Sequence, residues 1–175
     1  MVQNKFKGMT LAEVLVTMMV LALLLAVGFP GYMRATRERQ VESVALQIKN
    51  AIDETRQYSM APINSTNIVQ YYCFQISSAS RTWTISEYRS ENEPVISNGC
   101  SGTNISTGTI PSNMNITLNG DNWRTFLTHR YENNVGGGIG EMYPRTPISI
   151  TVARTGLNGF SKTVRVNTEG VVNVE

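Results

Sequence analysis

The apolar and polar residues divide the chain into three successive patterns. From Met9 to Met33 the residues are almost all apolar, and Glu13 is the only charged side chain among them. This run reaches the ~20 residues that a helix needs to cross a bilayer. The sequence therefore predicts a membrane-spanning helix over about 9–33, with one carboxylate near its beginning.

The second pattern is that of an amphipathic helix. Charged residues lie on one side of it, and Lys49 precedes Asp53 by four residues, the spacing of a surface ion pair. On the other side, apolar side chains recur three or four positions apart at Val41, Val44, Ala45, Ile48, Ile52 and Tyr58. We expect this apolar stripe to pack on a β-sheet.

Together, the two patterns predict one long helix over 9–61. Its part from Met9 to Tyr58 would be about 75 Å long at ~1.5 Å per residue, so roughly half of the helix would lie outside the membrane. Gly28 and Pro30 predict a kink or a local melting, because proline removes a helical hydrogen bond and clashes with the preceding turn. Pro62 is expected to end the helix.

In the third pattern the apolar residues alternate with polar ones. Short turns separate the runs, as in antiparallel hairpins. The predicted strands are 67–77, 81–88, 114–118, 148–153, 162–167 and 171–175. The first two should form one hairpin and the last two another. We therefore expect an α+β fold, with the long helix packed on a two-layer antiparallel β head formed by 62–175.

Composition adds a prediction about the two cysteines. The head is rich in Asn, Ser, Thr and Gly, and Cys73 and Cys100 are the only cysteines of the 175 residues. Their separation excludes a CxxC site, and the sequence offers no ligand cluster for zinc. We expect a disulfide that stabilises the head by about 3 kcal/mol and requires an oxidising compartment. The alternative is a pair of buried thiols.

The residues before the apolar run distinguish it from a secretory signal peptide. The leader "MVQNKFKG" is basic and ends in Gly8, and no small-x-small cleavage site follows the apolar core. This arrangement resembles a type IV prepilin or type II secretion pseudopilin. Members of that family carry Glu at the fifth mature position and often Pro at the twenty-second, which correspond to Glu13 and Pro30 when Met9 is counted first. The family prefers Phe at the first mature position, so Met9 departs from its pattern.

The resemblance implies a processing and assembly route. Prepilin peptidase would remove residues 1–8 by cutting between Gly8 and Met9, and Met9 would be N-methylated. The mature chain would cross the bacterial inner membrane once, with its head in the periplasm, and join other pilin or pseudopilin subunits through its helix. Glu13 and Pro30 would be its assembly residues.

The free-energy cost of placing a carboxylate in lipid indicates that Glu13 has a function. This cost is about 2.5–3.5 kcal/mol near a helix centre and lower toward an end. Cleavage would create a new α-amino group at Met9, and the Met9 amine of a neighbouring subunit could pair with Glu13. The alternative is that Glu13 lies among the lipid headgroups without a partner.

The overall layout resembles the H-type pseudopilins and the minor pilins of fimbrial assembly and DNA uptake. It implies a minor subunit that initiates or tips a type IV pilus or a secretion pseudopilus. We expect no enzyme, cofactor or metal: His129 is the only histidine, and the glycine-rich 135–141 lacks the GK[ST] ending of a phosphate loop. The shared anchor leaves pilus and secretion system both open.

A DNA-binding minor pilin for natural transformation is the alternative function. It would use four cations in a stretch without acidic residues: Arg145, Arg154, Lys162 and Arg165. Neutralising four phosphates would give a salt slope of about −3.6. Against this, Lys162 and Arg165 have opposite parity on their strand. The chain also reads Gly170-Val171 where the resemblance suggests a Gly-Arg motif.

Overall fold

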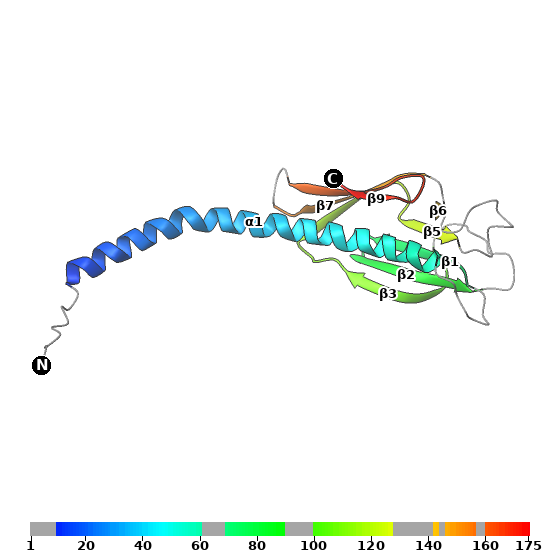
Figure 1. Ribbon diagram of the computed structural model, residues 1–175, viewed down its shortest axis with the longest axis horizontal. Helices are drawn as coiled ribbons and strands as arrows, with labels where there is room; N and C mark the ends of the chain where they lie inside the picture. Colours follow the sequence, from blue (N-terminus) through cyan, green and yellow to red (C-terminus); the bar gives the residue numbers. More distant parts are fainter. Residues whose placement is uncertain (1–9, 61–68, 90–99, 128–141, 144–145, 157–159) are drawn as a thin grey trace, which may run out of the picture. The chain divides into compact units, whose positions relative to one another are not determined.

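The computed structural model describes residues 10–60, 69–89, 100–127, 142–143, 146–156 and 160–175 (Figure 1). The chain divides into two units, residues 1–39 and 40–175. The described part contains one helix and two antiparallel sheets. Its elements are α1 (Leu11–Met60), β1 (Val69–Ser77), β2 (Thr82–Arg89), β3 (Thr103–Thr109), β4 (Met114–Asn119), β5 (Trp123–Leu127), β6 (Met142–Tyr143), β7 (Ile148–Arg154), β8 (Ser161–Val166) and β9 (Val172–Val174).

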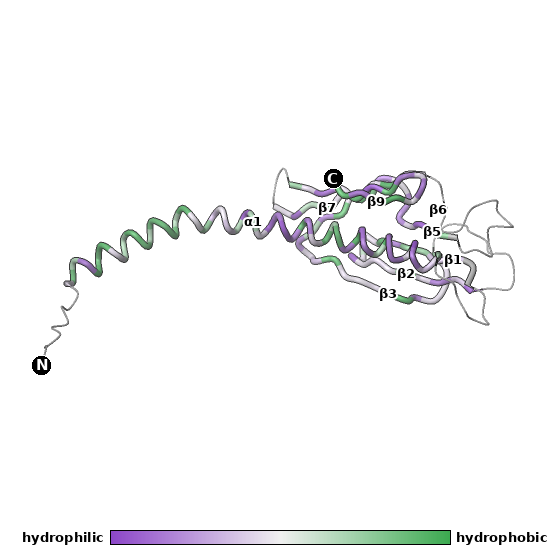
Figure 2. The backbone as a smooth tube through the Cα atoms, viewed as in Figure 1, coloured by the Kyte–Doolittle hydropathy of each residue, from purple (hydrophilic) through white to green (hydrophobic). Residues whose placement is uncertain are grey.

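The first unit contains the apolar part of α1. Its large hydrophobic side chains are exposed, and Figure 2 shows the hydrophobic colour running along this part of the helix. By length and composition α1 could cross a membrane. The helix continues through Gly28 and Pro30, so the local melting considered for this point is not found. Pro62 lies outside the described residues.

In the second unit, the predicted stripe of α1 is its buried face. Five of the six expected residues are fully buried: Val41, Val44, Ala45, Ile48 and Ile52. Tyr58 is only half-buried, and small residues complete the stripe at Ala51, Thr55 and Ser59. The Thr55 hydroxyl donates to the carbonyl oxygen of Ala51 at 2.7 Å, so it can be buried without an unpaired donor. The Lys49–Asp53 ion pair is also present, at 2.6 Å.

Sheet A has the strand order β3-β2-β1-β5-β6. The predicted first hairpin is confirmed, because β1 pairs antiparallel with β2 from Val69↔Arg89 to Ser77↔Thr82. β3, β5 and β6 were not predicted. On one face of β1, Phe74 and Ile76 contribute to the main core, while Tyr71 and Cys73 form a smaller cluster on the other face.

Sheet B has the order β4-β7-β8-β9, and all four of its strands were predicted. The terminal hairpin is formed by β8 and β9, which pair from Val164↔Val174 to Val166↔Val172. Ile150, Val152 and Val164 point into the core that also contains the buried face of α1 and the inner face of sheet A. The α+β architecture, with the helix packed on two antiparallel sheets, is therefore as expected.

A disulfide joins Cys73 of β1 to Cys100, which precedes β3. The Cα atoms are 5.6 Å apart, and 27 positions separate the two residues in the chain. Cys73 is fully buried, and Tyr71, Tyr88 and Trp123 lie in the same small cluster. The disulfide therefore fastens the segment before β3 to the outer face of sheet A.

Trp83 and Gly108 form a tight contact between β2 and β3. The two residues lie directly opposite each other in the antiparallel register. A Cβ atom added to Gly108 would lie 2.2 Å from two carbon atoms of the Trp83 indole. The indole, which packs on the main core, therefore occupies the space that any larger residue at 108 would need.

Candidate functional site

The proposed cleavage site, Gly8 and Met9, lies outside the described residues. Thr10 is the first described residue and lies immediately before α1. The processing role of Gly8 and Met9 therefore remains a prediction from the sequence, whereas the surroundings of Glu13 can be described.

Glu13 and Thr10 form a reciprocal cap at the start of α1. The Thr10 backbone N–H donates to Glu13 Oε2 at 2.9 Å, and the Thr10 hydroxyl donates to the same oxygen at 3.1 Å. In return, the Glu13 backbone N–H donates to Thr10 Oγ1 at 3.3 Å. This is a capping box, which satisfies backbone donors that the first turn of a helix leaves unpaired.

Sequence reasoning missed the partner of Glu13, although the signal was present. The segment "TLAE" has the S/T-x-x-E spacing of a capping box in front of an apolar run. The Glu13 side chain remains exposed, and together with Ala12, Val16 and Thr17 it lines a shallow concave part of the helix surface. An ionised carboxylate has about four acceptor positions, so Oε1 and part of Oε2 can still receive a donor.

Of the four cations considered for DNA binding, the three that the structure describes do not all share one surface, because Arg165 lies on the opposite face of sheet B from Arg154 and Lys162. Arg145 lies outside the described residues. Arg154 ends β7 and donates to the side-chain oxygen of Gln40 on α1. Lys162 shares its parity on β8 with the core residue Val164, while Arg165 points to the opposite face and lies 3.4 Å from Glu175.

The opposite parity of Lys162 and Arg165, noted in the sequence, is thus seen in the strand. Two of the cations have polar partners within the chain, which reduces what they can offer to phosphates. Nothing in this arrangement favours a DNA-binding surface.

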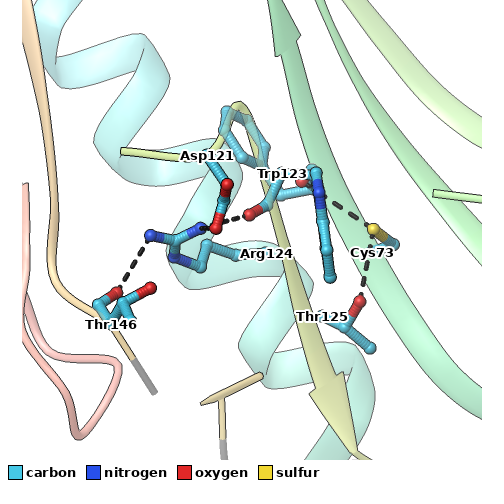
Figure 3. Close-up of polar contacts among 7 residues, drawn as sticks. Cys73, Asp121, Trp123, Arg124, Thr125 and Thr146 are labelled. Carbon is cyan, nitrogen blue, oxygen red and sulfur yellow. Dashed lines mark hydrogen bonds and ion pairs between the residues drawn. The ribbon is translucent and has the colours of Figure 1, made fainter. Parts of the chain in front are cut away.

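A buried arginine in the head was not foreseen (Figure 3). Arg124 of β5 is fully buried, lies opposite Phe74 of β1, and donates to the carbonyl oxygens of Trp123 at 2.5 Å and Thr146 at 2.9 Å. Burial lowers the pKa of Arg124 to about 10, and Asp121, 3.9 Å away, opposes that shift. Because Thr146 shortly precedes β7, Arg124 ties sheet A to the entry of sheet B.

The described part of the chain contains no candidate metal site. There, no group of three or more His, Cys, Asp or Glu side chains could hold a metal ion. His129 and the glycine-rich 135–141 fall outside that part.

Residues 3–29 match the prokaryotic N-terminal methylation motif. No protein with a curated description matches the sequence. Two crystal structures of the type IV minor pilin FimU from Pseudomonas aeruginosa are similar in fold. The first has a TM-score of 0.55 at 12% sequence identity, and the match covers 80% of this chain and 91% of the FimU chain. The second has a TM-score of 0.52 at 11% sequence identity, and the match covers 77% of this chain and 91% of the FimU chain. The minor pseudopilin EpsH of the Vibrio cholerae Type 2 Secretion System matches with a TM-score of 0.48 at 13% identity, covering 78% of this chain and 96% of EpsH.

The motif and the fold agree with each other. The matched residues 3–29 contain both Gly8 and Glu13, and the likeness to FimU covers 80% of this chain. The chain therefore combines a prepilin-type methylation motif with a type IV pilin-like fold. The motif and the apolar helix indicate a membrane anchor carrying a soluble head.

Proposed function

We propose that this chain is a minor subunit of a type IV pilus or of a type II secretion pseudopilus, and that it acts by joining the filament, at its initiation or its tip. The observation that carries this proposal is the methylation motif over residues 3–29. The pilin-like fold supports it. The subunit has no enzymatic role in this proposal, as is general for structural subunits of this kind.

Maturation would begin at the leader. Prepilin peptidase cuts between Gly8 and Met9 at the cytoplasmic side of the inner membrane, and the new amino terminus is methylated. Glycine suits the cut because a residue without Cβ lets the peptidase approach the backbone closely. The head lies in the periplasm, where the oxidising conditions suit the Cys73–Cys100 disulfide.

Assembly would then use Glu13. The carboxylate keeps its hydrogen bonds to Thr10 and accepts an additional charged donor, the α-amino group of Met9 on a neighbouring subunit. In the low dielectric of the membrane such a pair is much stronger than at a protein surface. Pairing would set the axial position of the incoming subunit and remove the cost of an unpaired carboxylate in lipid.

The processing step is tested by mass spectrometry of the full-length chain extracted from membranes. With active prepilin peptidase, we expect a mature chain that begins at N-methylated Met9. The change Gly8→Val should leave the chain at full length, because the added side chain obstructs the approach of the peptidase. A wild-type chain that still begins at Met1 beside active peptidase would contradict the proposal.

The assembly step is tested with Glu13→Gln. Glutamine keeps the shape and can still accept from Thr10, but it lacks the charge that attracts an ammonium group. We expect normal cleavage and membrane insertion, with a large loss of the chain from sheared filaments or cross-linked subunit complexes. Thr10→Val is the matched control: it weakens the cap but keeps the carboxylate, so it should be incorporated better than Glu13→Gln. Incorporation of Glu13→Gln at the wild-type level would refute the role of this charge.

A further inference from the structure

The two sheets have four edge strands in the described structure, and they differ in how well each is protected from pairing. β6 has two residues and β9 three, which is too short to support much additional pairing. β3 has seven residues, but its pairing with β2 shifts register between Ile85 and Ser86. Irregularities of this kind are a common protection of sheet edges.

β4 lacks such protection. It pairs with β7 in an unbroken register over all six residues, from Met114↔Arg154 to Asn119↔Ser149. Its sequence, "MNITLN", contains no charge and no proline, the two residue classes that most often block an edge. Among the four edges, β4 is the longest that is both regular and uncharged.

The alternation of hydrogen bonds along β4 shows which of its backbone groups do not bond to β7. The Thr155 N–H donates to the Asn113 carbonyl oxygen at 2.9 Å, so this opposite pair is hydrogen-bonded. Because hydrogen-bonded and non-bonded pairs alternate, Asn115, Thr117 and Asn119 bond to β7. The backbone N–H and C=O groups of Ile116 and Leu118 therefore point to the outer edge, away from β7.

The surroundings of this edge suit an uncharged extended chain. The side chains of Ile116 and Leu118 are only half-buried, although both pack against the core. A groove of about 220 Å³ lies at the beginning of β4, with Val44 and the buried Met114 among its lining. Its remaining lining is neutral as well: Gln40, Ser43, Gln47, Pro111 and Asn113.

We propose that the outer edge of β4 receives an extended, uncharged segment from the head of a neighbouring filament subunit, which adds a fifth strand to sheet B. Backbone hydrogen bonds to Ile116 and Leu118 hold the added strand, and its inward side chains cover the half-buried apolar residues of β4. The lining side chains of the groove are neutral, and the neighbouring Arg154 already donates to Gln40, so a highly charged occupant would lose water without gaining a partner among the lining residues. This inference rests on the proposed function, because it assumes a neighbouring subunit.

A proline at position 116 would disturb the outer edge of β4 without disturbing the fold of the head. Ile116→Pro removes an N–H that points away from β7, so the bonds between β4 and β7 are kept. Ile116→Ala is the matched control, because it loses the same side-chain packing but keeps the N–H. Similar thermal unfolding of the two heads would verify that both are folded.

The experiment uses the full-length chain in its own host, with the photoreactive residue benzoylphenylalanine in place of Thr117, whose side chain is exposed beside the edge. After illumination, cross-linked peptides are identified by mass spectrometry. We expect cross-links to the head of another protein with a prepilin leader. One lost backbone hydrogen bond predicts that Ile116→Pro reduces the cross-linked fraction about tenfold relative to Ile116→Ala.

The same cells report on both proposals. A chain cleaved after Gly8 and present in filaments, but without cross-links from position 117, would overturn the strand addition and leave the proposed function standing. Equal cross-linking of Ile116→Pro and Ile116→Ala would also overturn it, as would cross-links only to proteins without a prepilin leader. A chain that is neither cleaved nor incorporated would overturn both proposals.

Discussion

Replacing Gly108 with alanine would place a methyl group inside the volume of the Trp83 side chain. The added Cβ would lie 2.2 Å from Cε2 and Cζ2 and 2.5 Å from Nε1 of the indole, much closer than van der Waals contact. The indole would have to leave its position on the core, and overpacking of this kind costs about 1–3 kcal/mol. Alanine is otherwise favoured over glycine in a strand by about 0.5–1 kcal/mol. We therefore expect Gly108→Ala to lower the free energy of unfolding by roughly 1 kcal/mol, since the two effects together leave about 0–2.5 kcal/mol.

A double-mutant cycle tests the cause of this loss. Once Trp83→Ala has removed the indole, Gly108→Ala should stabilise the head by about 0.5–1 kcal/mol, because only the strand preference remains. The assay is urea unfolding of a soluble head, residues 40–175, followed by far-ultraviolet circular dichroism, since tryptophan fluorescence would change with the substitution itself. Equal effects of Gly108→Ala with and without Trp83 would refute the reasoning.

Three further predictions concern the head. Burial raises the pKa of Tyr71 above the ordinary 10.0, so the stability that its protonated form contributes is complete below pH 10 and is lost as pH rises through the folded-state pKa. In urea unfolding between about pH 8 and 11.5, Tyr71→Phe should therefore lose less stability with rising pH than wild type does. Parallel pH profiles of the two proteins would contradict this prediction. Replacing Cys73 and Cys100 by serine should cost about 3 kcal/mol in the chain-entropy model, and a reductant should then lower the melting temperature of wild type only. Arg124→Met leaves the carbonyl of Thr146 without its donor, which should cost about 1–3 kcal/mol in urea unfolding, and an unchanged midpoint would rule out a stabilising role for the guanidinium.

The strands found from the sequence are those whose side chains alternate between core and solvent. In β7, Ile148, Ile150 and Val152 point into the core, and the residues between them are polar or small, so the period of two is visible in the sequence. β3 shows no such period, because an edge strand that exposes most of its side chains needs few apolar residues. β5 was not recognised in the sequence for another reason. Arg124 occupies a core-facing position next to Phe126, where a charged residue is expected to be at the surface, so the alternation of apolar and polar residues is not visible.

The same limits apply to the candidate site. Glu13 was evident because a single carboxylate interrupts an apolar run, and its cap with Thr10 is local enough to be read from the spacing. The surroundings of the cations were not readable in that way. Arg154 reaches Gln40, which lies 114 positions earlier in the chain, and only the folded structure brings the two together. Parity along β8 did separate Lys162 from Arg165, because it depends on neighbouring residues alone.

Because α1 belongs both to the apolar segment and to the core of the head, it restricts where a protease could cut to release a folded head. Residues from Val41 to Ser59 form one wall of the head's interior, while the residues before Met33 are those expected to dwell in lipid. A protease that cut α1 after Val41 would release a fragment that lacks part of the buried face of α1. Because this face belongs to the core of the head, the fragment should unfold and be degraded. A cut within the short stretch 34–40 would separate the head from the apolar segment and leave its core complete, whereas a cut between Val41 and Ser59 would remove part of that core.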